Sequence, residues 1–208
     1  MKNFVKGLFV AALLLAGGAT VAAAELGKEY RLMEPPVRVS GKKIEVPEFF
    51  FYGCSHCFDL HKPLTVWEKK MPKDVELIYV PTIFKDSMEP MARTFYALES
   101  IGKGHKLHDA LYRAWNVDSV ELRDGAQISE FVASKGVDRA KFSAAYESFS
   151  VQSQATRAKQ MVRSYVIGGT PTIVVDGKYM ITGLYPEDTI RVLNEVIAMA
   201  RKERSHKK

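Results

Sequence analysis

The two cysteines of this 208-residue chain, Cys54 and Cys57, stand two residues apart. They follow an apolar, aromatic run, residues 48–52, of the kind found in strands that are covered on both faces. Gly53 ends the run and helical spacing starts at Phe58, so Cys54 is expected at the N-terminus of a helix. Unpaired backbone N–H groups and the positive end of the helix dipole stabilise an anion there. The pattern therefore predicts a lowered pKa for Cys54, whose thiolate is the reactive form.

A structural disulfide is the alternative interpretation of the cysteine pair. Closing a four-residue loop stabilises a fold by only about 2 kcal/mol, whereas a 100-residue loop contributes about 4.7 kcal/mol. Because the chain has no other cysteine, a single stapling bond would be expected to close a longer loop. A redox-active disulfide between Cys54 and Cys57, which needs no bound cofactor and no metal, is favoured.

Residues 1–24 have the pattern of a secretory signal peptide. Lys2 and Lys6 precede a short apolar stretch, and Ala22-Ala23-Ala24 provides an A-x-A cleavage site, used after Ala24 or a neighbouring residue. The apolar stretch is short for a bilayer, and a retained membrane anchor is the alternative. Export would place the cysteines in an oxidising compartment, where a disulfide can persist.

The charge pattern excludes one class of function. The formal net charge is +6, and the charges are dispersed apart from a basic C-terminal tail, residues 201–208. Since no basic helix is interleaved with aromatic residues, we expect no binding to nucleic acid. The length after signal removal suits one well-buried core, or one core with an inserted lobe.

Two kinds of structure alternate along the chain. Residues 87–167 show five helical stripes and almost no strand pattern, and one stripe puts Phe142, Tyr146 and Phe149 on a single face. Asp176-Gly177, between two β-rich runs, predicts a hairpin. The expected order is β-β-α-β, five helices and β-β-α, in which the strand before the cysteines begins at Glu48 or leaves Pro47 unpaired. The predicted domains are a flanking α/β unit, residues 25–84 and 167–208, and an all-helical insertion, residues 85–166.

Cys54-Ser55-His56-Cys57 at a strand-to-helix junction and Gly169-Thr170-Pro171-Thr172 before a late strand together resemble the thioredoxin fold. The inserted helices narrow the resemblance to the DsbA-type thiol:disulfide oxidoreductases, over residues 26–202. The resemblance implies an α/β thioredoxin fold with an inserted all-helical domain. It also implies a periplasmic oxidase that donates its disulfide to newly exported proteins.

Residue by residue, the resemblance makes Cys54 the attacking cysteine and Cys57 its buried partner, with Ser55 and His56 setting the redox poise. His56 can donate a hydrogen bond to the Cys54 sulfur; a histidine facing solvent is the alternative.

The resemblance also assigns residues outside the cysteine motif. Pro171 matches the family's cis-proline, preceded by Thr170; a trans-proline opening a strand is the alternative. Glu48 matches a buried acid that relays protons to the resolving cysteine, and an exposed strand glutamate is its alternative. The chain departs from the family's best-known member at three positions: Ser55, where that protein has a proline, Tyr79, where it has a lysine, and Pro47, where it has no proline.

Several functions remain open at this point. The leading hypothesis is a monomeric oxidase that is reoxidised by a membrane, quinone-linked partner of the DsbB type. A reductase or isomerase of the same fold is the runner-up. A zinc module formed by the two cysteines with His105 and His108 is less favoured, since two histidines at the start of a helix are more simply surface residues. A chaperone-like binder is the third alternative.

Overall fold

The computed structural model describes residues 23–120 and 122–206. Most of the predicted signal peptide, residues 1–22, lies outside them. The chain forms five strands and seven α-helices within this part, and the element order agrees with the sequence prediction. The strands are β1 Arg31–Leu32, β2 Ile44–Phe50, β3 Val75–Pro81, β4 Thr172–Val175 and β5 Tyr179–Thr182. The helices are α1 Ser55–Glu68, α2 Glu89–Ser100, α3 Gly104–Asn116, α4 Gly125–Ser134, α5 Arg139–Tyr146, α6 Phe149–Ser164 and α7 Pro186–His206.

The strands form one mixed sheet in the order β1-β5-β4-β2-β3. The central strand β2 pairs in parallel with β3 and antiparallel with β4. The prediction that β2 begins at Glu48 is wrong, because the strand starts at Ile44 and includes Pro47, which lies opposite Ile78 of β3. The antiparallel pairing with β4 begins only at Glu48, so Pro47 adjoins a part of β2 that β4 does not pair.

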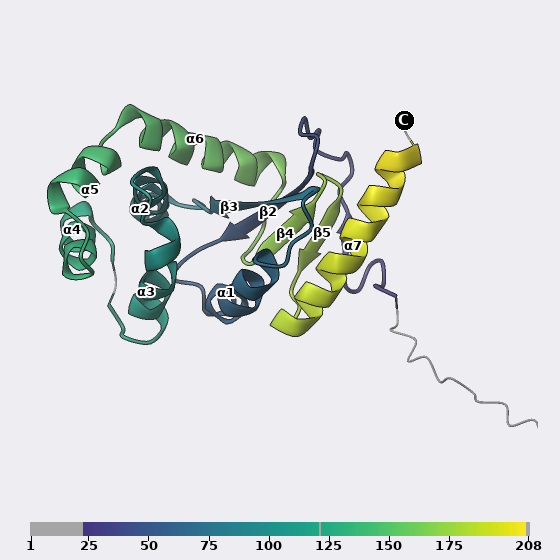
Figure 1. Ribbon diagram of the computed structural model, residues 1–208, viewed down its shortest axis with the longest axis horizontal. Helices are drawn as coiled ribbons and strands as arrows, with labels where there is room; N and C mark the ends of the chain where they lie inside the picture. Colours follow the sequence, from purple (N-terminus) through teal and green to yellow (C-terminus); the bar gives the residue numbers. More distant parts are fainter. Residues whose placement is uncertain (1–22, 121, 207–208) are drawn as a thin grey trace, which may run out of the picture.

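Helices cover both faces of the sheet (Figure 1). Helices α1 and α7 pack on one face around Leu64, Leu193 and Val196, and α6 covers the other face through Ala158 and Val162. Successive residues of a strand point to opposite faces. Phe49 accordingly packs in the cluster on the α6 side, whereas Phe50 joins the core of the helical insertion.

Helices α2 to α6 lie between β3 and β4 in the sequence and build a second apolar core around Leu111, Ile128 and Phe142. The prediction that Phe149 continues the face of Phe142 and Tyr146 is wrong. Phe149 is 84% exposed, because Ser148 caps a new helix at this point by accepting a hydrogen bond from the Val151 N–H. The domain boundaries at 84/85 and 166/167 stay a prediction.

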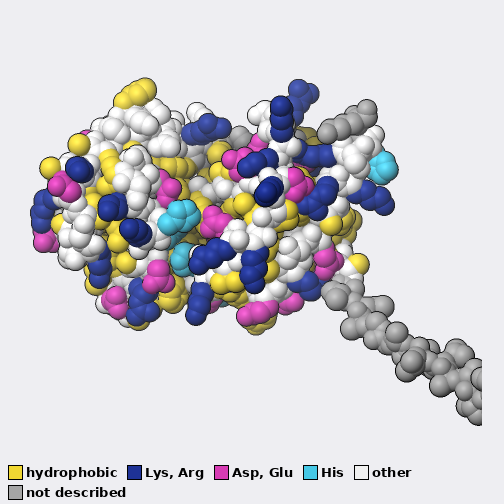
Figure 2. All heavy atoms as spheres, in the orientation of Figure 1, with side chains coloured by type: hydrophobic (Ala, Val, Ile, Leu, Met, Phe, Trp, Pro, Cys, Tyr) yellow, Lys and Arg dark blue, Asp and Glu magenta, His cyan; other side chains and the backbone are white. Residues whose placement is uncertain are grey.

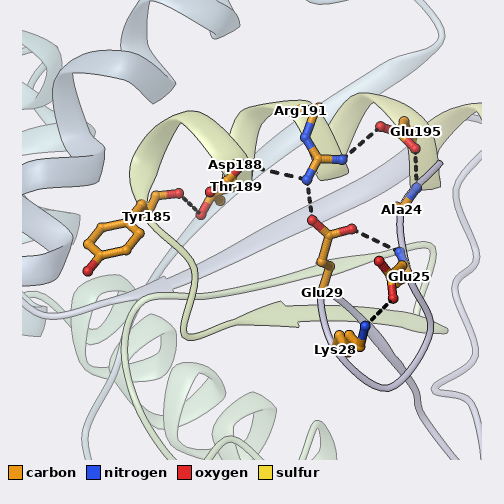
Figure 3. A network of polar contacts seen from close by, with 9 residues as sticks. All are labelled: Ala24, Glu25, Lys28, Glu29, Tyr185, Asp188, Thr189, Arg191 and Glu195. Carbon is orange, nitrogen blue, oxygen red and sulfur yellow. Dashed lines mark hydrogen bonds and ion pairs between the residues drawn. The ribbon is translucent and has the colours of Figure 1, made fainter. Parts of the chain in front are cut away.

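A tight turn joins the last two strands of the α/β part, and a set of polar contacts fixes the segment before its first strand. Asp176 and Gly177 both have positive φ, 55° and 65°, in the predicted turn between β4 and β5. The segment before β1 is fixed to α7, where the Arg191 guanidinium lies between Glu29 and Glu195, and the Ala24 N–H donates to Glu195 (Figure 3). No helix in residues 23–120 and 122–206 has the length and apolar character needed to cross a bilayer.

Candidate active site

Cys54 is the N-cap residue of α1, with extended backbone angles of φ −98° and ψ 117°. The strand-to-helix transition predicted from the aromatic run is therefore present. Gly53 allows it, because a Cβ there would lie 2.6 Å from the Phe51 ring and 3.1 Å from Trp115. The first turn of α1 contains no acidic side chain, so no nearby carboxylate cancels the positive end of the helix at the sulfur.

The Cys54 thiol is strongly acidic in this setting. A hydrogen bond with Cys57 is the largest cause of a pKa of about 5, and hydrogen bonds from the Thr170 side chain and the His56 backbone lower it further, against the effect of burial. In the protonated form the Cys54 thiol donates a hydrogen bond to the Thr170 carbonyl oxygen at 3.3 Å, and this interaction favours the thiol. The balance favours a thiolate at neutral pH.

Cys57 is fully buried on the first turn of α1. Burial raises the pKa of its thiol far above the ordinary value, and the neighbouring Cys54 sulfur raises it further. The two sulfurs therefore have opposite properties: Cys54 is a half-buried leaving group that is stable as an anion, and Cys57 strongly holds its proton. Both cysteines are free in this structure, which accordingly represents the reduced form.

The two residues between the cysteines, Ser55 and His56, are exposed. His56 acts on the Cys54 sulfur through its backbone N–H, whereas the sequence interpretation gave this role to its side chain. The imidazole instead lines a cavity of about 360 Å³ beside Cys54. His56 thus faces solvent, as one alternative held, and its backbone also acts on the Cys54 sulfur, as the other held in part.

The Thr170–Pro171 peptide bond is cis, as the family resemblance implies. This loop lies against Cys54 through the Thr170 carbonyl, and it forms one wall of the same cavity. Leu184 and Tyr185 also line this cavity, and Tyr185 is 80% exposed. Sequence reasoning missed these two residues, whose only signal was an apolar pair in the loop before the last helix.

Glu48 is buried, with 2% of its surface exposed, so its alternative as an exposed strand residue is excluded. Burial, and then the nearby charge of Glu68, raise the pKa of Glu48 to about 8. Its charge in turn acts on the Cys57 thiol. Tyr79 lies directly opposite Glu48 on β3 and donates a hydrogen bond to Glu68 at 3.0 Å. Glu48 can therefore hold or release a proton near neutral pH.

The interpretation of both histidines as surface residues is wrong for His108. Its side chain is 4% exposed and stacks on Tyr112 with ring centroids 5.7 Å apart, because α3 turns this position toward the aromatic cluster under β2. Burial lowers the pKa of His108 well below its usual value. Among the described residues, no three His, Cys, Asp or Glu side chains come together so as to hold a metal ion. The zinc ligand set proposed for the cysteines with His105 and His108 is therefore not assembled.

This fold and this pair of dissimilar sulfurs define a thiol:disulfide oxidoreductase of thioredoxin type. The family model described as DSBA-like thioredoxin domain matches residues 45–193. The thiol:disulfide interchange protein DsbA of Pseudomonas aeruginosa is 35% identical over 206 residues, covering 97% of this chain and 98% of the relative. The DsbA of Burkholderia cepacia is 36% identical over 183 residues, with 86% of each chain covered.

Solved structures agree with this result. The crystal structure of Pseudomonas aeruginosa DsbA superposes with a TM-score of 0.83 at 34% identity, covering 88% of this chain and 97% of that one. DsbA from Xylella fastidiosa gives a TM-score of 0.79 at 28% identity, covering 87% of this chain and all of the other. The chain belongs to the DsbA family. It is a thiol:disulfide oxidoreductase that acts through its own cysteine pair.

Proposed function

We propose that the protein is an exported dithiol oxidase that donates the Cys54–Cys57 disulfide to reduced, unfolded proteins. The observation that supports this direction of transfer is the contrast between the two thiols, with the Cys54 pKa near 5 and that of Cys57 strongly raised. Because the reduced form gains a stable thiolate, the disulfide is easier to reduce. A protein that loses its disulfide readily is an oxidant.

The transfer takes place in two displacement steps. A substrate thiolate attacks the Cys54 sulfur, forms a mixed disulfide with it and breaks the Cys54–Cys57 bond, so that Cys57 leaves as a thiolate and takes up a proton. A second substrate thiolate then attacks the substrate sulfur of the mixed disulfide and releases Cys54 as the stable thiolate. The substrate has lost two electrons and two thiol protons, and the enzyme has gained the two electrons.

Glu48 is the proposed proton donor and acceptor for Cys57. Its pKa of about 8 allows it to be protonated before the disulfide opens and to take the proton back during reoxidation. The cavity beside Thr170, Pro171 and His56 would accept an extended substrate segment, whose backbone can pair with the cis-proline loop. Ser55 and His56 adjust the stability of the Cys54 thiolate.

The cellular setting is also a proposal. Cleavage of residues 1–24 would release the enzyme into the periplasm, where newly exported proteins are its substrates. Reoxidation would come from a membrane, quinone-linked protein of the DsbB type, which removes the two electrons. The enzyme would act as a monomer.

Single cysteine variants test the mechanism with a reduced, unfolded ribonuclease as the substrate. We expect Cys54→Ala to abolish oxidation of the reduced substrate. Cys57→Ala has no disulfide of its own, so it is incubated with unfolded ribonuclease that still contains disulfides; its Cys54 thiolate should attack one of them and accumulate a mixed disulfide that non-reducing electrophoresis detects. Full activity of the Cys54→Ala variant would contradict the mechanism. Equilibration with glutathione separates an oxidase from a reductase, because the reference potentials are roughly −120 mV for DsbA and roughly −270 mV for thioredoxin. These two values are general properties of the reference proteins, and a result near the second would favour a reductase.

A further inference from the structure

Glu48 needs a route to solvent if it is to serve Cys57 in every catalytic cycle. The carboxyl is 2% exposed, and each turnover delivers one proton to Cys57 or removes one from it. Because the pKa of Glu48 is about 8 in the reduced protein, the carboxylate left after protonation of Cys57 takes up a new proton from solvent at neutral pH, and it must lose that proton before it can accept one from Cys57 again. The groups that lie between Glu48 and the surface therefore determine how quickly the site is reset.

Tyr79 lies beside Glu48 on the edge strand β3 and is partly exposed. The two residues are direct neighbours on the parallel strands β2 and β3, so their side chains leave the sheet on the same face. The Tyr79 hydroxyl donates to Glu68 Oε2 at 3.0 Å, and Glu68 on α1 is partly exposed. The charges of both Glu48 and Glu68 act on the Tyr79 hydroxyl, in addition to burial. Tyr79 thus lies beside the buried carboxyl of Glu48 and donates a hydrogen bond to the partly exposed carboxyl of Glu68.

A pocket of about 450 Å³ opens to solvent next to this hydroxyl. Tyr79 and His108 line its inner part, and Lys69 and His105 line its exposed part. Figure 2 shows histidine and acidic side chains gathered on this face, between α3 and α1. Both ring nitrogens of His108 are buried without a hydrogen-bond partner in the described part of the chain. A polar wall of this kind favours water inside the pocket.

We propose that Tyr79 and Glu68 form the outer part of the proton route between Glu48 and solvent. The proposal rests on the proposed role of Glu48 as the proton carrier of Cys57. In reoxidation the Cys57 proton passes to the Glu48 carboxylate, and the Cys57 sulfur forms its bond to Cys54. Protonated Glu48 then gives its proton to the Tyr79 oxygen while the Tyr79 hydroxyl proton moves to Glu68, which releases it to water. Tyr79 ends neutral, so no tyrosinate is formed.

The surrounding groups set the pH dependence of this route. Several titratable groups face the region of Glu48 and Tyr79. They are Glu68, His61 and Cys57 on α1, His108 and Tyr112 on α3, and Glu99 on α2. His108 stays neutral because burial lowers its pKa well below the usual value. Glu48, with a pKa of about 8, is then the group of this route that changes charge between pH 5 and 9.

The intramolecular step isolates the proton transfer. Reduced enzyme is mixed with increasing oxidised glutathione, and tryptophan fluorescence follows formation of the enzyme disulfide. At high glutathione the rate reaches a plateau set by attack of Cys57 on the mixed disulfide. At pH 7 this attack requires that Glu48, whose pKa is about 8, first loses its proton through the route. We expect Tyr79→Phe, which keeps the ring and loses only the hydroxyl, to lower this plateau by roughly 100-fold, the lower end of the range for positioned proton transfer.

A matched control separates this role from simple loss of a hydrogen bond. Tyr179→Phe also removes a tyrosine–glutamate hydrogen bond, from Tyr179 to Glu203 on α7, at a site distant from the cysteines in the fold. This variant should keep the wild-type plateau. Added imidazole should raise the plateau of Tyr79→Phe and leave that of the wild type unchanged, because a small acid–base molecule in the pocket replaces the missing hydroxyl.

The remaining outcomes are distinguishable. Glu68→Gln keeps the acceptor for Tyr79 but cannot take up a proton, and it should also slow the plateau. A wild-type plateau in Tyr79→Phe, or a slow one that imidazole does not restore, would overturn the route. If Glu48→Gln is slow while Tyr79→Phe is normal, the role of Glu48 stands and the route fails. A normal plateau in Glu48→Gln would instead reject the proposed role of Glu48 itself.

Discussion

Replacing Glu48 by Gln should change how the stability of the protein depends on pH. The carboxyl has a pKa of about 8 in the folded chain and an ordinary value of 4.5. The folded state therefore binds a proton more tightly than the unfolded state, and the stability of the wild type falls as pH rises from 4.5 to 8. Converting this difference gives a cost of about 5 kcal/mol above pH 8, about 3 kcal/mol at pH 7 and none below pH 4.5.

Urea unfolding of the oxidised protein, followed by circular dichroism at pH 5, 7 and 9, measures this effect. The neutral amide of Glu48→Gln has no such cost. The free energy of unfolding of the variant should therefore rise by about 3 to 5 kcal/mol relative to that of the wild type as the pH goes from 5 to 9. Glu45→Gln, on the same strand but partly exposed, is the matched control. The difference between its free energy of unfolding and that of the wild type should stay the same at all three pH values. If the difference in the free energy of unfolding between the wild type and Glu48→Gln stays constant over this pH range, the burial argument is refuted.

Two further substitutions test the structure away from the cysteines. His108→Phe keeps a ring against Tyr112 and removes two buried nitrogens without partners, so it should raise the free energy of unfolding by about 1–3 kcal/mol at pH 7. The difference in the free energy of unfolding between the variant and the wild type should grow below pH 6.5, since the unfolded wild type then binds a proton that buried His108 does not. A variant that is less stable than the wild type at pH 5 would contradict this. Gly177→Ala should cost more than about 2 kcal/mol in thermal or urea unfolding, because φ is 65° and a Cβ would meet the Val37 carbonyl oxygen at 2.0 Å. Gly136→Ala, with φ of 82° and open space around it, should cost only about 1 kcal/mol, and equal losses would show that the close approach at Val37 does not matter.

Local sequence signals were sufficient for the parts of the site that depend on one element and its neighbour. The aromatic run before Gly53 predicts β2 and the helix start at Cys54, and Asp176-Gly177 predicts the last hairpin. These features need no distant contact, since turn chemistry and backbone periodicity determine them. The family resemblance added the cis bond at Pro171.

The rest of the site depends on contacts between distant segments. His108 is buried because residues from β2, β3 and α2 surround it, and nothing in the sequence of α3 shows this. Tyr79 was visible from the sequence as a departure from the family, but its hydrogen bond to Glu68 arises only when α1 packs against β3. Tertiary packing of this kind is not encoded in a local pattern.

The acidity of the Cys54 thiol is the central claim, and direct titration tests it. The absorbance of the reduced protein at 240 nm reports the thiolate, and subtracting the curve of a Cys54→Ser variant isolates this sulfur. Cys57 stays protonated over the accessible pH range, because burial raises the pKa of its thiol far above the ordinary value. The account predicts a single inflection near pH 5. An inflection near the ordinary thiol value of 9 would contradict it.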